Sequence, residues 1–354
     1  MRAALLLSRY GLGRTAPNPS VGCVLVKDGV LVGRGRTADG GRPHAETEAL
    51  SCAKHLAKGA TAYVTLEPCA HHGQTPPCAA ALIKAGVARV VIAAPDPDAR
   101  VAGAGVTMLR DAGVEVTEGV LQTEAEAVLA GYLTLRRLRR PAVTVKIAST
   151  LDGRIALQDG TSKWITGPRT RAYVHQLRAQ HDAVMTASGT VRADDPSLTC
   201  RLAGYDAPQP LRVVVSSAFT LSPDSQLATT TDQGPVMVLA ADGDPQFKGQ
   251  DTVTEIPVAA GADGTPDPVA ALETLGGQGI TSVLVEAGGR FVASLMKAGV
   301  VDQLIWTRSS GVIGGDGLPS LSSLGLDDLA QGRIFRRVKS LIIDDDAIEI
   351  FRRR

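Results

Sequence analysis

The sequence predicts an α/β protein with two layered domains. Short apolar runs with the length of buried strands alternate with segments of helical periodicity in both halves of the chain. The 354 residues, 44% hydrophobic and 21% charged, have the composition of a globular protein and suffice for two hydrophobic cores. A basic run at residues 136–140, followed by Pro141, is typical of a solvated helix end and linker. We therefore expect domains at 1–140 and 141–354.

The elements of the N-terminal half follow one another closely. Residues 1–8 predict an amphipathic helix and not a signal peptide, because arginines follow the apolar run at once. The remaining pattern predicts, in order, strand 21–26, helix 44–57, strand 61–66, helix 78–84, strand 87–93, helix 105–111 and strand 114–117. This alternation favours a sheet with helices on both faces, an α/β/α sandwich.

The C-terminal half continues the alternation. We expect strands at 143–148, 183–186, 212–216, 236–240 and 282–286, and helices at 170–179 and 289–297. Residues 222–268 are rich in Asp, Gly, Pro and Thr. We expect this stretch to contain loops and the least ordered part of the chain.

Charge and composition exclude several classes of protein. The 37 basic and 36 acidic residues give a formal charge of +1, which argues against a nucleic-acid partner, and 3% aromatic residues leave no stacking platform for single strands. No apolar stretch approaches the ~20 residues that span a bilayer. Five cysteines, an odd number, fit a reducing cytoplasm better than a disulfide framework. We expect a cytoplasmic protein with a small-molecule partner and no membrane association.

The residues richest in chemistry are His44, Glu46, Cys69 and Cys78. One imidazole and two thiolates hold Zn²⁺ while leaving its fourth position open, and a water bound there has a pKa lowered toward neutrality. A carboxylate that does not bind the metal can move protons beside it, and Glu46 has that position. The pattern His-x-Glu, then Pro-Cys, then a second Cys is the signature of zinc deaminases.

Spacing alone leaves the second cysteine ligand open. The usual signature places it three residues after the first, where this chain has His72, and eight residues separate Cys69 from Cys78. His71 and His72 therefore compete with Cys78 as ligands. We favour Cys78, because thiolates hold zinc strongly and two prolines precede it, and we expect the two histidines to face the substrate. A purely structural zinc site is disfavoured, because it would have no use for Glu46.

In the C-terminal half, a predicted strand runs into Gly288 and Gly289 at a helix start. Glycines there let backbone N–H groups approach a phosphate, and the helix dipole favours the anion. The signal is weak, because a Gly-Gly pair at such a turn is more often structural. It is also not the Rossmann fingerprint, since the one Gly-x-Gly-x-x-Ala string, at 11–16, follows a helix and not a strand.

Taken together, residues 18–24, 44–46 and 65–78 closely resemble the bifunctional deaminase/reductase family of riboflavin biosynthesis. In that family the eight-residue gap between the cysteines is the normal form. The resemblance implies that His44, Cys69 and Cys78 bind Zn²⁺, that Glu46 is the catalytic proton shuttle and that Asn18 contacts the substrate. It also implies a cytidine-deaminase-like fold for this half.

Residues 146–154, 162–166, 194–199 and 286–289 are similar to the reductase domain of the same family, which resembles dihydrofolate reductase in fold. The resemblance places the NADPH contacts on Ala148, Trp164, Thr190, Asp194, Ser217, Gly288, Gly289, Arg290, Phe291, Val292, Ala293 and Ser294. It places the substrate contacts on Ser162, Arg178, Leu198, Arg201 and Glu286. The two arginines suit a ribose phosphate.

The resemblance implies two consecutive reactions and Zn²⁺ and NADPH as cofactors. The first domain would remove the 2-amino group of a diaminopyrimidinone that carries a phosphoribosylamino arm. The second would reduce that arm to a ribityl phosphate with NADPH. The family is usually oligomeric, so we expect at least a dimer through the reductase half.

Two alternatives stay open from the sequence. One is a nucleoside or tRNA-editing deaminase with an unrelated, non-catalytic second domain. The other is a binding or regulatory protein in which one site has decayed, against which the intact zinc signature argues.

Overall fold

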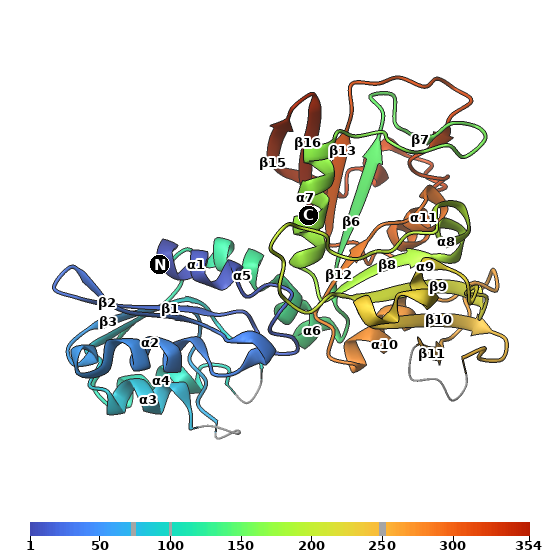
Figure 1. Cartoon of the computed structure of the whole chain (residues 1–354). Helices are drawn as coiled ribbons and strands as arrows, with labels where there is room; N and C mark the ends of the chain where they lie inside the picture. Colours follow the sequence, from blue (N-terminus) through green and yellow to red (C-terminus); the bar gives the residue numbers. More distant parts are fainter. Residues whose placement is uncertain (72–75, 99–100, 248–252) are drawn as a thin grey trace. The chain divides into compact units, whose positions relative to one another are not determined.

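The computed structural model describes residues 1–71, 76–98, 101–247 and 253–354 (Figure 1). The chain divides into two compact units, an N-terminal unit at Met1–Arg139 and a C-terminal unit at Arg140–Arg354. Each unit has its own sheet and its own hydrophobic core. In the described residues, no helix combines the length and apolar character needed to cross a membrane.

The N-terminal unit is built on a five-stranded sheet in the order β2-β1-β3-β4-β5. Its strands are β1 (Gly22–Lys27), β2 (Val30–Arg36), β3 (Thr61–Leu66), β4 (Arg89–Ala94) and β5 (Glu115–Thr117). The first three are antiparallel neighbours, and β3, β4 and β5 are parallel. The carboxyl ends of β3 and β4 therefore lie at the same edge of the sheet, where the chain reaches Cys69.

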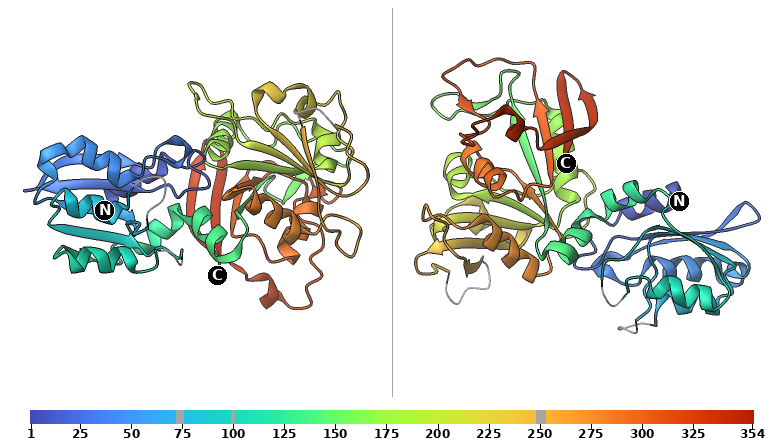
Figure 2. Two further views of the ribbon diagram at one scale, coloured as in Figure 1. Left: turned by 90° about the horizontal axis from the view of Figure 1, so that it is seen from below. Right: turned by 180° about the vertical axis from the view of Figure 1, so that it is seen from behind.

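Helices cover both faces of this sheet, as the predicted sandwich requires. One face carries α2 (Ala45–Ala53), α3 (Cys78–Lys84) and α4 (Ala104–Asp111), and the other carries α1 (Arg2–Arg9) and α5 (Gln122–Val128) (Figures 1 and 2). A further helix, α6 (Ala130–Leu138), closes the unit. The small and branched side chains of β1, β3 and β4 fill the core between the layers.

The C-terminal unit is built on a nine-stranded sheet in the order β11-β10-β9-β8-β12-β6-β13-β16-β15. The seven strands from β11 to β13 are parallel, and an antiparallel hairpin of β15 and β16 completes one edge. The strands are β6 (Ala142–Ser149), β8 (Ala183–Ala187), β9 (Leu211–Ala218), β10 (Val236–Asp242), β11 (Val253–Pro257), β12 (Ser282–Val285), β13 (Gln303–Arg308), β15 (Phe335–Ile343) and β16 (Asp346–Arg353). A parallel sheet of this kind binds ligands at the carboxyl ends of its strands.

Alternate side chains of the central strands enter separate cores. Val283 and Val285 of β12 pack with α10 (Pro268–Gly277) and α11 (Gly289–Lys297), whereas Leu284 packs with α7 (Pro168–Ala179). The shorter helices α8 (Ser188–Asp194) and α9 (Gln226–Thr229) bound a third core on β8, β9 and β10. A two-stranded sheet of β7 (Arg154–Ala156) and β14 (Leu318–Pro319) lies apart from the large one.

Some elements differ from the prediction. The predicted helix 44–57 is α2 followed by a 3₁₀ turn, η2 (Lys54–Ala57), because Lys54 adopts a left-handed backbone with φ of 51° that ends the α-helix. The stretch 222–268 contains α9, a 3₁₀ turn η3 (Thr231–Gln233) and strand β11 besides the expected β10, although residues 248–252 lie outside the described part. Parallel pairing with β10 accounts for β11 despite its mixed composition.

Candidate active sites

A His/Cys/Cys cluster forms where three elements of the N-terminal unit begin or end. His44 is the N-cap of α2, Cys69 follows β3, and Cys78 is the first residue of α3. The Nδ1 atom of His44 lies 3.3 Å from the Cys78 sulfur and 3.8 Å from the Cys69 sulfur. The side-chain donor atoms of the three residues all lie within 4.8 Å of one another.

These distances fit a zinc ion. Zinc–nitrogen and zinc–sulfur bonds of about 2.0 and 2.3 Å at tetrahedral angles place the ligand atoms roughly 3.6 Å apart. In the described residues this is the one group of histidine, cysteine and acidic side chains with such spacing. Three protein ligands leave the fourth tetrahedral position open, which is the arrangement of a catalytic and not a structural site.

The surroundings of Cys69 also favour its thiolate, the ionised form that binds a metal. The Cys69 sulfur accepts hydrogen bonds from Cys78, through its thiol and its backbone N–H at 3.3 Å, and from His44. These contacts outweigh burial and lower the pKa of Cys69 to about 4. The pKa of Cys78 is raised, because its thiol is hydrogen-bonded to Cys69 and is buried. Before metal binding, Cys69 and Cys78 therefore share one negative charge.

Glu46 lies in the first turn of α2 and is 4% exposed. Burial, with a further contribution from the Cys69 charge, raises the pKa of Glu46 to about 7. A carboxyl group that exchanges protons near neutral pH beside a metal cluster has the property required of a proton shuttle.

The alternative histidine ligands do not join this cluster. His71 is described but does not belong to the group of mutually close donor atoms, and its buried Nδ1 atom has no hydrogen-bond partner. His72 lies outside the described residues. Asn18 lies in the same unit, and its amide donates to the carbonyl of Gly41, three residues before His44, at 3.1 Å.

Glu67 is a supporting residue to which the sequence assigned no role. Its buried carboxylate accepts backbone N–H groups from Asp96, Gly103, Gly105 and Val106 at 3.1–3.4 Å. Because Glu67 stands two residues before Cys69, these bonds fix the end of β3 to the loop after β4 and to the first turn of α4. The sequence shows that Glu67 comes shortly before Cys69. The four backbone N–H groups that it binds lie far along the chain, so only the folded structure reveals them.

In the C-terminal unit, the predicted ligand-binding residues gather at the carboxyl ends of the parallel strands. Glu286 follows β12, and the Arg178 guanidinium from α7 binds its carboxylate through two hydrogen bonds, Nε–Oε1 at 2.6 Å and Nη2–Oε2 at 3.0 Å. Burial alone would raise the pKa of Glu286. The Arg178 charge and hydrogen bonds outweigh that effect and hold the pKa at about 2.

Lys146 belongs to the same polar group and was not among the predicted site residues. It lies on β6, burial lowers its pKa, and the Glu286 charge opposes that shift. A lysine within an otherwise apolar strand was the available sequence signal. Arg201 lies on the loop after Cys200, where its guanidinium donates to the hydroxyls of Ser197 and, at 3.3 Å, Thr199.

Several of the predicted cofactor and substrate residues touch one another. The Ser162 hydroxyl donates to the Asp194 carboxylate at 3.3 Å, and the backbone N–H of Gly288 donates to Thr190 at 3.2 Å. Trp164 is 67% exposed, with the Arg171 guanidinium 4.4 Å from the centroid of its ring. Ala148 is half-buried near the end of β6, and Ser217 is exposed near the end of β9.

Other predicted residues point into the core. Leu198 is 2% exposed, and Val292 and Ala293 are buried on the inner side of α11, so these three can meet a ligand only through their backbones. Arg290 is exposed, and Phe291 and Ser294 are half-buried, with the Ser294 hydroxyl bonded to the Phe291 carbonyl at 2.8 Å.

Gly289 has a packing role. A Cβ atom at this position would lie 2.8 Å from the Pro319 carbonyl oxygen and 3.0 Å from that of Ser320, whereas one at Gly288 would meet nothing closer than 4.0 Å. Gly288 thus has room for a Cβ atom before α11. The lack of a side chain at Gly289 instead lets the backbone of residues 319–320 pack closely against it.

The N-terminal unit has the layers and donor set of a zinc-dependent deaminase, and the C-terminal unit has the open parallel sheet of a nucleotide-binding reductase. A family model for the cytidine and deoxycytidylate deaminase zinc-binding region matches residues 1–94, and one for the RibD C-terminal domain matches residues 141–344. The chain belongs to the RibD family of bifunctional deaminase/reductases of riboflavin biosynthesis.

Individual relatives match over both domains. The riboflavin biosynthesis protein RibD of Escherichia coli is 41% identical over 95% of this chain and 94% of its own length, and that of Bacillus amyloliquefaciens is 42% identical over 91% and 87%. A solved structure of Acinetobacter baumannii RibD has a TM-score of 0.90 at 37% identity, covering 100% of this chain and 97% of its own.

The crystal structure of a diaminohydroxyphosphoribosylaminopyrimidine deaminase/5-amino-6-(5-phosphoribosylamino)uracil reductase from Thermotoga maritima has a TM-score of 0.88 at 35% identity, with the same coverage of 100% and 97%. These matches confirm the predicted family, the predicted two-domain α/β fold class and the bifunctional enzyme. They do not favour a single deaminase with an unrelated second domain.

Proposed function

We propose that the chain deaminates 2,5-diamino-6-(5-phosphoribosylamino)pyrimidin-4-one and then reduces the product to 5-amino-6-(5-phosphoribitylamino)uracil. The observation that carries the proposal is the pairing, in one chain, of the His44/Cys69/Cys78 cluster beside Glu46 with the Arg178–Glu286 site at the carboxyl edge of a parallel sheet. The substrates are those named in the description of the matched Thermotoga maritima deaminase/reductase.

In the N-terminal unit, His44, Cys69 and Cys78 would hold Zn²⁺. The ion supplies a water whose pKa is lowered toward neutrality. Glu46 would carry one proton of the attacking water to the ring nitrogen and the second, from the resulting hydroxyl, to the leaving amine. Water therefore replaces the 2-amino group and ammonia departs. The unpartnered His71 Nδ1 atom is available to bind the substrate.

In the C-terminal unit, NADPH would lie over the turn at Gly288, with contacts to Thr190, Asp194 and Trp164. The cofactor supplies a hydride for C1′ of the ribose. The bond between C1′ and the ring oxygen would break and the ring oxygen would take a proton from solvent, so the ribose would open to a ribityl chain. Arg178, Arg201 and Lys146 provide positive charge for the anionic substrate, and Glu286 orients Arg178 through its two hydrogen bonds.

The proposal extends to assembly and location. The exposed edge strand β15 carries Val338 and Ile342, which are 39% and 73% exposed, and we propose that the C-terminal unit forms at least a dimer. The five cysteines are all free, which suits the reducing cytoplasm. Light scattering of the purified chain tests the dimer, and a monomer at micromolar concentration would contradict it.

The function is tested with the zinc-loaded protein, the diaminopyrimidinone phosphate and NADPH. Ammonia release and NADPH oxidation are counted in the same reaction. One NADPH oxidised per ammonia released is the expected result. Ammonia without NADPH oxidation would refute the reductase assignment, and NADPH oxidation that needs a separately deaminated substrate would refute the deaminase assignment.

A further inference from the structure

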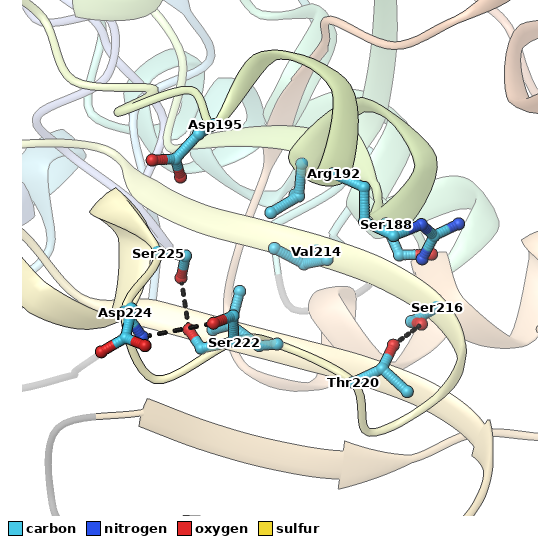
Figure 3. A pocket seen from close by; sticks show the side chains of 11 residues that line it. Ser188, Arg192, Asp195, Val214, Ser216, Thr220, Ser222, Asp224 and Ser225 are labelled. Atoms are coloured by element: carbon cyan, nitrogen blue, oxygen red, sulfur yellow. Dashed lines mark hydrogen bonds between the residues drawn. The ribbon is translucent and has the colours of Figure 1, made fainter.

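The loop of residues 195–201 joins the two proposed ligand sites of the C-terminal unit. It begins at Asp195, which lines the β9 pocket, a cavity of about 260 Å³ between α8 and the loop of residues 220–225, with β9 as its floor (Figure 3). Neighbours of Thr190 on α8 also line this pocket, so it belongs to the proposed cofactor site. The loop ends at Arg201, one of the predicted substrate contacts. The place of Arg201 therefore depends on what holds this second end of the loop.

His175 and Arg178 on α7 hold that end of the loop. They are three residues apart and therefore lie on the same face of the helix. Arg178 donates through Nη1 to the Thr199 carbonyl at 2.9 Å, and Nδ1 of His175 accepts the backbone N–H of Arg201 at 3.3 Å. The thiol of Cys200 donates to the His175 carbonyl at 3.4 Å. Three consecutive residues of the loop are thus bound to α7.

Arg201 lies close enough to Arg178 for their positive charges to repel each other. Partial burial and the Arg178 charge lower the pKa of Arg201, and the Glu286 charge opposes them only in part. Arg201 donates through Nη1 to the hydroxyls of Ser197 and Thr199. Within the part of the chain that the structure describes, its Nε and Nη2 groups make no hydrogen bond. Free guanidinium donors beside a second cation suit an anion, and the proposed substrate carries a phosphate.

The imidazole of His175 must be uncharged to make its hydrogen bond. A backbone N–H can donate only to a ring nitrogen that carries no proton, so Nδ1 is bare and Nε2 bears the hydrogen. Burial and the charges of Arg178 and Arg201 lower the pKa of His175, and the Glu286 charge and the Thr199 carbonyl oppose them only in part. At neutral pH the ring is therefore an acceptor, and it adds no third positive charge to the two arginines.

We propose that His175 is a positioning residue of the reductase, which holds the backbone of Arg201 so that its guanidinium meets the substrate phosphate beside Arg178. The inference rests on the proposed reductase function and adds to it a residue that binds neither substrate nor cofactor. While the site is empty, repulsion between the two arginines drives the loop away from α7. The hydrogen bond from Arg201 to His175 opposes that movement. Arg201 is therefore in place before the substrate arrives, and binding does not have to order the loop.

The test measures steady-state kinetics of the reductase on the full, zinc-loaded chain, with NADPH and 5-amino-6-(5-phosphoribosylamino)uracil as substrates. His175→Leu removes the acceptor nitrogen. His175→Asn keeps an acceptor, because the amide oxygen of asparagine can take the place of Nδ1. Gln176→Leu, at the exposed neighbouring position of α7, is the matched control. Thermal unfolding of each variant verifies that it is folded.

We expect His175→Leu to raise the KM for the phosphoribosylaminouracil about tenfold, the effect of losing a charge-assisted hydrogen bond to the phosphate. The kcat and the KM for NADPH should stay unchanged, because the phosphate is remote from the reacting C1′ and contributes uniform binding. His175→Asn and Gln176→Leu should keep the KM within about twofold of the wild type. An unchanged KM in His175→Leu, or a His175→Asn variant that behaves like His175→Leu, would overturn the inference.

A double-mutant cycle with Arg201→Ala shows whether His175 acts through Arg201. In the Arg201→Ala background, His175→Leu should cause no further rise in the KM, since the guanidinium that His175 positions is absent. Equal effects of His175→Leu in both backgrounds would overturn the inference and leave the reductase assignment intact. A wild-type chain that does not oxidise NADPH with the phosphoribosylaminouracil would refute the reductase assignment itself.

Discussion

Arg178 and Glu286 form a bidentate ion pair in which the two side chains are only 12% and 14% exposed. The pair joins α7 to the end of β12, and the Arg178 guanidinium also donates to the Thr199 carbonyl at 2.9 Å. Burying two charges is costly, and removing one partner alone typically costs 3–5 kcal/mol because the other charge remains buried. The pair is therefore a sensitive point of stability, formed by two residues that we propose bind the substrate.

This pair gives the C-terminal unit a defined response to acid. The pKa of Glu286 is about 2, below its ordinary value of 4.5, so the carboxylate stabilises the folded state above about pH 4.5. That stabilisation, about 3 kcal/mol at neutral pH, is lost as the pH falls from about 4.5 to 2. Denaturant unfolding of wild type and Glu286→Gln should show a free-energy difference that shrinks over this range.

The exposed Glu115, which is paired with Arg89, supplies the control for losing a surface carboxylate. Glu115→Gln should change the unfolding free energy by less than about 1 kcal/mol. A Glu286→Gln difference that stays constant from pH 7 to pH 2.5 would contradict the assigned pKa.

Glu46→Gln should keep zinc and lose deamination. The amide is similar in size to the carboxyl, so the His44/Cys69/Cys78 cluster stays intact, but it cannot take a proton from water. Ammonia release should fall by about 10²–10⁴-fold. Zinc content by mass spectrometry and NADPH binding by calorimetry are the controls, and both should match the wild type. Near-normal ammonia release would exclude Glu46 as the proton shuttle.

The choice between Cys78 and His71 as zinc ligand can be tested by metal content. Cys78→Ser should lose most of its zinc during dialysis against a weak chelator, because a thiolate ligand is replaced by a hydroxyl. His71→Ala should keep its zinc, since His71 lies outside the cluster. Cys52→Ser, which removes an exposed thiol, is the matched control. Zinc loss from His71→Ala equal to that from Cys78→Ser would contradict the ligand assignment.

Glu67→Gln should loosen the metal site without touching a ligand. Four backbone N–H groups converge on the Glu67 carboxylate, and an amide would turn an N–H group toward some of them. We expect a loss of about 1–3 kcal/mol in the stability of the N-terminal unit and faster zinc release to a chelator. Glu118→Gln, which breaks an exposed ion pair with Arg110, should leave both quantities unchanged. Unaltered zinc release from Glu67→Gln would show that the loop anchor does not support the site.

Substitutions at the two glycines before α11 should separate packing from cofactor binding. Gly289→Val forces side-chain atoms against the carbonyls of Pro319 and Ser320, and such overpacking typically costs 1–3 kcal/mol. We expect a lower unfolding midpoint of the C-terminal unit, weaker NADPH binding and normal ammonia release. Gly288→Ala has room for its methyl group and should keep the unfolding midpoint. A Gly289→Val variant as stable as the wild type would contradict this packing role.

Hydrophobic periodicity accounts for most of the predicted elements. The strand at Thr61–Leu66 and the helix at Cys78–Lys84 have the predicted bounds. Strand β2 was missed, because its Val30 and Leu31 are more than half exposed and glycines and arginines follow. Pairing with β1 forms that strand, and pairing partners are not visible in the local pattern.

The residue types of the His/Cys/Cys cluster were predictable, because few side chains bind zinc and their spacing is diagnostic. The sequence left the second thiolate open, and the distances in the structure bring Cys78 to the cluster. The C-terminal site was less accessible to sequence reasoning. Arg178 and Glu286 lie far apart in the chain and meet only because α7 packs beside β12. The β9 pocket has no sequence signature, since it arises from the path of the loop after β9.

Strand β2 also sets how close α2 lies to the sheet. A Cβ atom at Gly33 would lie 2.4 Å from the Ala49 carbonyl oxygen, and one at Gly35 would lie 2.5 Å from that of Ala45. A single methyl group at either position requires α2 or β2 to shift, and a shift of α2 would move Glu46 together with His44, the N-cap of that helix, relative to Cys69. These two glycines thus offer a way to shift the carboxylate that we propose as the proton shuttle, while every residue of the proposed site keeps its identity.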